Sequence, residues 1–159
     1  EALEQLGVTE FNRVVVCIGS TEPSVLTVTE LVELGVTDIW AKALTDTQAR
    51  ILERVGASRV VRPEHEMGER VAHMVTGKML DYIELDAEFA LVETLAPRDL
   101  HGKDLASADV RGRYGVTVVC LKPRGEAFTY ATADTVISEG DILLVAGETS
   151  NVEGFAALD

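Results

Sequence analysis

The chain has 159 residues and a formal net charge of −13, from 27 acidic and 14 basic side chains. So acidic a surface repels the phosphates of nucleic acids and anionic lipids, which argues against binding to either. Hydrophobic residues make up 47% of the sequence, enough for a core, and no apolar run approaches the roughly 20 residues that cross a bilayer. With no signal peptide at its start, we expect a cytoplasmic protein without direct membrane insertion.

Residues 1–76 predict three consecutive βα units joined by short connections, as in a parallel sheet. Strands are expected at 14–18, 39–44 and 60–61, and helices at 21–34, 46–55 and after Pro63. Gly35 and Gly56 are expected to end the first two helices, and Gly56 lies where a positive φ is needed. Because residues 14–18 are continuously apolar, we expect a central strand that is buried on both faces.

A central strand needs a neighbour on each side, but only a short helical stretch, residues 2–6, precedes this one. An unpaired apolar edge would invite aggregation. We therefore expect the second half of a doubly wound Rossmann-like sheet. The first half of such a sheet carries a G-x-G-x-x-G phosphate loop, and no such loop occurs in the sequence.

Residues 88–159 predict a small α+β module with the order β-α-β-β-β-α. Its strands are expected at 89–95, 116–121, 127–131 and 142–146, with a short helix within 103–113 and a closing helix capped by Asn151. Residues 77–87 are expected to connect the two modules. The expected fold class is thus α/β, half of a doubly wound parallel sheet, followed by this α+β subdomain. Cys17 and Cys120 each lie in an apolar run, so we expect buried, inert thiols.

Four residues of the first module lie where parallel sheets bind ligands, at the carboxyl ends of strands. Gly19 and Ser20 follow the first strand, although an ordinary turn would look the same. Lys42 interrupts an apolar strand, so it needs an acidic partner, a ligand phosphate or an edge facing water. Glu64 begins a helix, where it either ligates a hard cation beside phosphates or only complements the helix dipole.

The second module contains the turn VRGRYG, in which Arg111 and Arg113 precede Tyr114. Two guanidiniums beside an aromatic ring suit a phosphate and a stacked base, whereas the alternative is a helix end with favourable cations and a packing tyrosine.

Other polar patterns are weaker. Three residues recur every four positions in the helix after Pro63, namely His65, Glu69 and His73, but their spacing is not that of a zinc site. No nucleophile is paired with a base, so we expect no enzyme.

Two long runs resemble a known family. IWAKALTDTQARILERVGASRVVRPEHEMGERVA, residues 39–72, resembles the second half of an RCK (regulator of potassium conductance) domain, with its P-E-x-x-M-G motif intact. GKDLASADVRGRYGVTVVCLKPRGE and the later SEGDILLVAGE resemble the C-terminal subdomain of the same family. The resemblance covers nearly the whole chain and is strongest to the cytosolic regulatory subunits of Ktr/Trk-type potassium uptake systems.

The resemblance implies a partial Rossmann-like subdomain at 1–76, a hinge at 77–87 and a ligand-sensing subdomain at 88–159. It implies a gating subunit that forms homodimers, arranged in a ring beneath a membrane pore subunit. ATP/ADP or NAD(H) would bind at Gly19, Ser20, Lys42 and Glu64, with Glu64 ligating Mg²⁺ or Ca²⁺. Without the phosphate loop, we expect weak nucleotide binding by this chain.

The resemblance also implies a C-terminal ligand cleft, which we expect to be lined by Arg111, Tyr114 and Thr117. Family members that bind cyclic di-AMP there often have asparagine where this chain has Thr117, and proline near Ala133. Two alternatives remain for the function. The first is a regulatory domain of another cation transporter or antiporter. The second is a fragment of an NAD-dependent oxidoreductase, for which His101 is the candidate acid or base.

Overall fold

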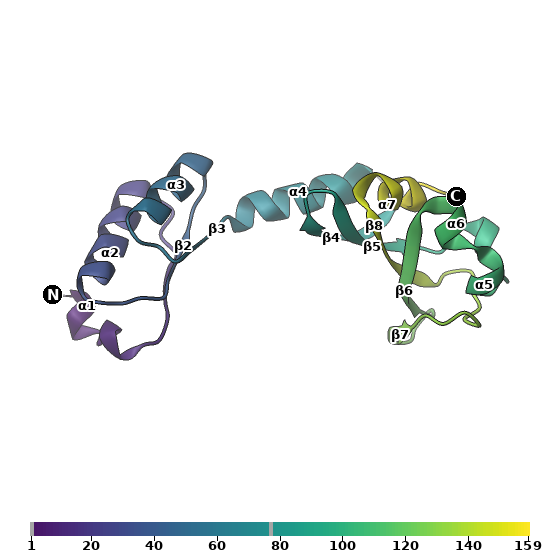
Figure 1. The fold of residues 1–159 in the computed structure, drawn as a ribbon, viewed down its shortest axis with the longest axis horizontal. Coiled ribbons are helices and arrows are strands. Elements are labelled where there is room, and N and C mark those ends of the chain that lie inside the picture. Colours follow the sequence, from purple (N-terminus) through teal and green to yellow (C-terminus); the bar gives the residue numbers. More distant parts are fainter. Residues whose placement is uncertain (1, 77) are drawn as a thin grey trace. The chain divides into compact units, whose positions relative to one another are not determined.

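The computed structural model describes residues 2–76 and 78–159, and the chain divides into two compact units (Figure 1). The units are Glu1–Gly68 and Glu69–Asp159. Within the described ranges, no helix is both long enough and apolar enough to cross a membrane.

The first unit contains a three-stranded parallel sheet in the order β1-β2-β3. Its strands are β1 (Val14–Val16), β2 (Ile39–Lys42) and β3 (Arg59–Val61). Its helices are α1 (Ala2–Gln5), a 3₁₀ turn at Val8–Glu10, α2 (Thr21–Glu33), α3 (Asp46–Arg54) and the start of α4 (Pro63–Thr76). The three predicted βα units are therefore confirmed.

Both α2 and α3 pack on the same face of this sheet, because successive parallel strands are joined by right-handed crossovers. The buried side chains of this layer come from the strands and from the two helices: Val16, Ile39, Ala41, Val28, Leu31 and Leu52.

The prediction for β1 was wrong in one respect. We expected a strand buried on both faces, but Val15 is 53% exposed and Cys17 is exposed as well. Along a strand, successive side chains point to opposite faces, and the described helices cover only one face of this sheet. Cys17 is thus not a buried thiol, whereas Cys120 is half-buried.

The second unit contains an antiparallel sheet in the order β4-β5-β8-β6-β7. The strands are β4 (Met79–Asp86), β5 (Phe89–Leu95), β6 (Val116–Lys122), β7 (Thr129–Tyr130) and β8 (Ile142–Glu148). The helices are the 3₁₀ turn Arg98–Leu100, α5 (Leu105–Ala108), α6 (Val110–Tyr114) and α7 (Thr149–Ala156). Helix α7 packs against β5, β6 and β8, where Val92, Val145 and Phe155 are fully buried.

We expected residues 77–87 to form a connector, but the structure contains a strand within this segment. Residues 79–86 form the strand β4, which pairs with β5 through a short turn at Ala87 and Glu88. The pairing of β4 with β5 shifts register twice, between Met79 and Asp81 and between Glu84 and Asp86. Its apolar residues therefore do not alternate cleanly, and the sequence pattern concealed the strand. Gly77 lies outside the described residues.

The last helix also begins earlier than expected. Helix α7 starts at Thr149, with Glu148 at the N-cap position, so Asn151 lies inside the helix and is not its cap. The Asn151 side chain packs against Gly115, where an added Cβ would lie 2.7 Å from the amide nitrogen. Asn151 therefore contacts the turn that precedes β6.

From Glu69 onward, α4 belongs to the second unit. The guanidinium of Arg70 donates two hydrogen bonds to the carboxylate of Asp81, the one from Nε being 2.6 Å long. The imidazole of His73 stacks on Tyr82 at 3.9 Å and pairs through Nδ1 with Glu153 at 2.9 Å. These contacts bind the second half of α4 to β4 and α7.

Candidate functional site

The first candidate site, here called the strand-end site, consists of Gly19, Ser20, Lys42 and Glu64. Parallel strands end at one common edge of a sheet, which brings residues after β1, β2 and β3 together. Lys42 is the last residue of β2, and its Nζ forms an ion pair with Oε1 of Glu64 in the first turn of α4. Two of the four residues expected at this site are therefore in direct contact, although an ion pair between them was not predicted.

The ion pair explains how a lysine is accommodated at the end of the apolar strand β2. Its side chain is 25% exposed, and Glu64 supplies its counter-charge. The hydrogen bond from Lys42 lowers the pKa of the Glu64 carboxyl, with a further contribution from the backbone amide of Glu64. A ligand phosphate would therefore compete with a carboxylate for the lysine.

A metal at this site would have Glu64 as its protein ligand. A carboxylate oxygen suits a hard cation such as Mg²⁺ or Ca²⁺. In the parts of the chain that the structure describes, no group of three or more His, Cys, Asp or Glu residues is arranged to hold a metal ion. The donor set fits a cation held jointly by Glu64 and ligand phosphates, not a metal held by protein alone.

Gln48 belongs to this site, although the sequence analysis did not select it. Its side chain is 3% exposed; Oε1 accepts the Leu44 amide at 2.9 Å, and Nε2 donates to the carbonyl of Gly19 at 3.4 Å. It therefore links the turn after β1 to the turn after β2. The signal was present, because Thr45 and Gln48 match the S/T-x-x-E/Q capping box, and the Thr45 hydroxyl accepts the Gln48 amide.

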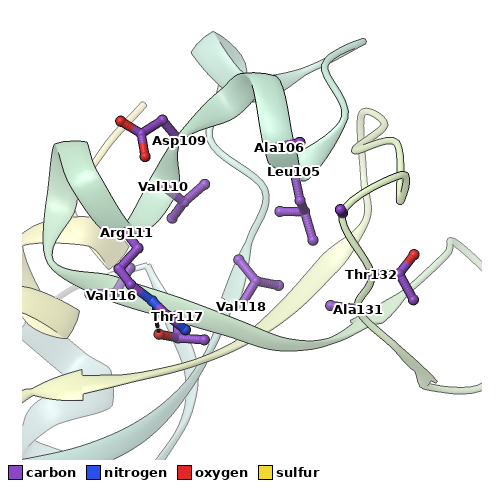
Figure 2. A pocket seen from close by; sticks show the side chains of 11 residues that line it. Leu105, Ala106, Asp109, Val110, Arg111, Val116, Thr117, Val118, Ala131 and Thr132 are labelled. Carbon is purple, nitrogen blue, oxygen red and sulfur yellow. Dashed lines mark hydrogen bonds between the residues drawn. The ribbon is translucent and has the colours of Figure 1, made fainter.

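The second candidate site is a pocket of about 550 Å³ in the second unit, here called the α5–β6 pocket (Figure 2). Its walls come from α5, α6, β6 and the segment after β7: Leu105, Ala106, Asp109, Val110, Arg111, Val116, Thr117, Val118, Ala131, Thr132 and Ala133. Backbone hydrogen bonds hold the later segment beside α5, including one of 3.0 Å from the Ala106 amide to the Ala133 carbonyl.

Two of the predicted cleft residues meet in this pocket. Nε of Arg111 donates a hydrogen bond of 3.0 Å to Oγ1 of Thr117. Figure 2 shows this contact at one end of the pocket, with the side chains of Val110 and Val118 nearby. The pocket is lined by Arg111, by the acid Asp109 and by apolar side chains, and the arginine together with the apolar side chains suits a ligand with both an anionic and an apolar part.

The third predicted cleft residue, Tyr114, does not line this pocket. Its hydroxyl donates to Oδ2 of Asp99 at 2.7 Å, and its ring meets Phe155 edge-on at 5.4 Å. Arg113 donates to the same Asp99 oxygen and stacks on the Tyr114 ring. Asp99 raises the pKa of Tyr114, and the Tyr114 hydroxyl is the main cause of the lowered pKa of Asp99. The residue packs α6 onto α7, which is the structural alternative considered above.

The remaining histidine candidates are engaged by protein groups. The His101 ring nitrogen Nε2 lies 3.0 Å from the carbonyl oxygen of Ala96. His73, on the helical stripe considered for zinc, is stacked on Tyr82 and paired with Glu153. Each therefore has a structural role in the second unit.

Comparison with known proteins identifies the family of this chain. A model described as the TrkA-N domain matches residues 1–63, and one described as the TrkA-C domain matches residues 89–158. The chain is 39% identical over 155 residues to the Ktr system potassium uptake protein C of Bacillus subtilis, which covers 96% of this chain and 70% of the relative. The chain belongs to the Ktr potassium uptake protein family.

Further relatives agree with this assignment. The chain is also 30% identical over 149 residues to the Ktr system potassium uptake protein A of Vibrio alginolyticus. The match covers 92% of this chain and 68% of the relative. The crystal structure of the GsuK RCK domain aligns with a TM-score of 0.56 at 19% identity, covering 92% of this chain and 32% of that chain. The latter likeness shows the fold alone. The predicted RCK resemblance is confirmed.

Proposed function

We propose that this chain is a cytosolic regulatory part of a potassium transport system, which senses a small ligand and controls ion flux without catalysing a reaction. The observation that carries the proposal is the α5–β6 pocket, which lies entirely in the part of the chain that matches the TrkA-C domain. The relatives are potassium uptake proteins by name, which favours potassium over the other cations considered as alternatives.

The ligand of the α5–β6 pocket is a phosphate-bearing small molecule, with cyclic di-AMP as the first candidate. Arg111 supplies the charge for a phosphate, and Val110, Val116 and Val118 supply an apolar lining for a base. Thr117 offers one hydroxyl where an asparagine would offer an amide, so we expect affinity below that of asparagine-containing relatives.

A nucleotide such as ATP, ADP or NAD(H) is the proposed ligand of the strand-end site. Lys42 would contact its phosphates, and Glu64 would hold a Mg²⁺ or Ca²⁺ ion between itself and those phosphates. Because the sequence contains no glycine-rich phosphate loop, this chain by itself would bind the nucleotide weakly.

The proposed assembly is a homodimer, built into a ring beneath a membrane pore subunit. Apolar residues at every fourth position of α4 are exposed and support a dimer contact there: Met67 is 51%, Val71 is 42% and Val75 is 79% exposed. Met79, in β4, is buried in the core of the second unit and does not add to this exposed surface.

Calorimetric titration with cyclic di-AMP tests the proposal. We expect saturable binding that Arg111→Ala weakens by about tenfold or more, because a charge-assisted bond to phosphate is lost. Arg124→Ala is the matched control, since it removes the same charge from an exposed turn outside the pocket. Equal weakening by both substitutions would contradict a specific site, and unaffected binding in Arg111→Ala would place the ligand elsewhere.

A second titration, with ATP and Mg²⁺, addresses the strand-end site independently. We expect weak binding that Lys42→Ala abolishes and Lys78→Ala leaves unchanged. Lys78 is the control because its ammonium pairs with Asp159 in the second unit. Tight binding by this chain would contradict the proposed contribution of a phosphate loop.

A further inference from the structure

The bond between Arg111 and Thr117 joins two elements across a tight turn. Arg111 lies on α6 and Thr117 on β6, with Gly115 between them at φ 69°. The bond uses Nε of the guanidinium and the hydroxyl oxygen of Thr117, 3.0 Å apart (Figure 2). Arg111 is exposed, so without this bond its long side chain would sample many rotamers.

Thr117 is held more firmly than its partner. It pairs with Ala146 across β6 and β8, inside the five-stranded sheet, and its side chain is β-branched with few χ1 choices. Because this hydroxyl oxygen is fixed in position, the hydrogen bond to it fixes the orientation of the Nε–H group of Arg111. The donor end of the guanidinium is therefore oriented before any ligand arrives.

The choice of nitrogen also restricts how an anion can bind. A guanidinium has five N–H donors, and a phosphate can take two of them either side-on, through Nε and one Nη, or end-on, through both Nη atoms. Among the described residues, the Thr117 hydroxyl is the one hydrogen-bond partner of the Arg111 guanidinium. With Nε occupied, the end-on pair remains for the ligand.

We propose that Thr117 is a positioning residue for Arg111, and that the α5–β6 pocket takes the phosphate of a phosphodiester end-on, through the two Nη atoms. The inference rests on the proposed function of this pocket as a ligand site. Thr117 acts here through the arginine, so a change at Thr117 alters affinity without removing a charge. A pre-oriented donor also loses less freedom on binding, which favours affinity.

The first test needs no ligand. In ¹H–¹⁵N spectra of the free protein, the Nε–H resonance of Arg111 should be separate from those of solvent-exposed arginines and slow to exchange. Thr117→Val, which keeps the side-chain shape and removes the hydroxyl, should move this resonance to the position of a free arginine. Thr117→Ser should leave it in place. A resonance that Thr117→Val does not move would overturn the positioning role.

The second test is titration with cyclic di-AMP. Thr117→Val should weaken binding about threefold to tenfold, the range for one net hydrogen bond. Thr117→Ser, which keeps the hydroxyl, should bind the ligand as the unsubstituted chain does. In an Arg111→Lys background, which lacks the planar fork, Thr117→Val should have no further effect. Additive losses from the two substitutions would mean that Thr117 contacts the ligand directly, and would overturn the inference.

Together, the two tests distinguish failure of the proposed ligand site from failure of the proposed positioning role. If Thr117→Val moves the Nε–H resonance but the unmodified chain does not bind cyclic di-AMP, the ligand site and the end-on phosphate are refuted while the Arg111–Thr117 bond stands. Binding that depends on Arg111 but not on Thr117 would support the proposed function and refute the positioning role. Thermal unfolding of Thr117→Val checks that the sheet is intact.

Discussion

Two arginines, two positions apart on α6, have different partners. Arg111 donates to Thr117 at the α5–β6 pocket, whereas Arg113 donates to Asp99 and stacks on Tyr114. The first bond leaves most donors of its guanidinium at the pocket, and the second belongs to a packed cluster. At the scale of single residues, identity and spacing indicated two equivalent cations, but the partner of each decides what it does.

Tyr114→Phe tests the structural role of Tyr114. The substitution removes a hydroxyl that bonds Asp99 and keeps the ring that meets Phe155. A hydrogen bond to a partly exposed carboxylate is worth about 1 kcal/mol, so we expect the free energy of unfolding to fall by about that amount in urea denaturation. Tyr130→Phe, at a tyrosine that is 87% exposed, is the matched control and should change little. Unchanged stability of Tyr114→Phe would show that the bond contributes nothing.

The two ends of helix α3 depend on particular residues. Helix α3 begins with the Thr45 cap, and Gly56 follows its last turn with φ 110°. An added Cβ at Gly56 would lie 2.6 Å from Cγ2 of Val32 on α2. The glycine is therefore required both by its backbone conformation and by the close approach of the two helices.

Gly56→Ala and Gly35→Ala separate these two requirements. Gly35 also has positive φ, 84°, but no atom lies within 4 Å of an added Cβ. We expect Gly35→Ala to destabilise the first unit by about 1 kcal/mol through backbone strain alone. Gly56→Ala should cost more, because Val32 must also move. Chemical denaturation of both variants measures the difference, and equal losses would mean that the contact with Val32 relaxes freely.

Helix α4 contributes to both units, and its second half depends on Arg70 and Asp81. The two hydrogen bonds from Arg70 are the main cause of the lowered pKa of Asp81, and partial burial opposes them. A carboxyl whose pKa is lower in the folded than in the unfolded chain stabilises the fold above its unfolded pKa. This contribution is lost as the pH falls through the folded pKa.

Asp81→Asn should therefore destabilise the second unit at pH 6, with faster amide hydrogen exchange in residues 70–75 of α4. Below about pH 4, where the unfolded carboxyl takes up its proton, the difference from the unsubstituted chain should narrow. Asp86→Asn is the control, on the same strand, where the carboxylate accepts a hydrogen bond from the Glu88 amide in the following turn. A difference that stays constant from pH 6 to pH 2 would rule out the charged pair as its source.

At the scale of the whole molecule, the exposed stripe on α4 bears on the proposed homodimer. Met67, Val71 and Val75 recur every four residues and are each more than 40% exposed. A charge introduced into the middle of such a stripe would be desolvated in a dimer but hydrated in a monomer.

Val71→Glu should therefore weaken dimerisation by about tenfold or more, as measured by sedimentation equilibrium across micromolar concentrations. Leu6→Glu, at a residue that is 71% exposed near the start of the chain, is the control and should leave the dimer intact. A chain that is monomeric at tens of micromolar before any substitution would contradict the dimer. A dimer insensitive to Val71→Glu would locate the contact elsewhere.

Much of the candidate sites follows from the sequence, for identifiable reasons. Lys42 and Glu64 were assigned to one site because the ends of consecutive parallel strands must meet at one edge, but their ion pair was not anticipated. Arg111 and Thr117 are close along the chain, so a single turn brings them into contact. Ala131 and Thr132 were not anticipated, because they reach the pocket through the packing of the loop before β8 against α5.

The sequence pattern was enough to predict the βα order of the first unit, most strands of the second, and the positions of Lys42 and Glu64 at the ends of neighbouring strands, because periodicity and strand order are local properties. Three outcomes could be read only from the folded structure: which face of β1 is covered, that residues 79–86 join the second sheet as β4, and that Tyr114 packs on α7. These outcomes depend on contacts between segments distant in sequence, and the register shifts of β4 hide its pairing from any local pattern.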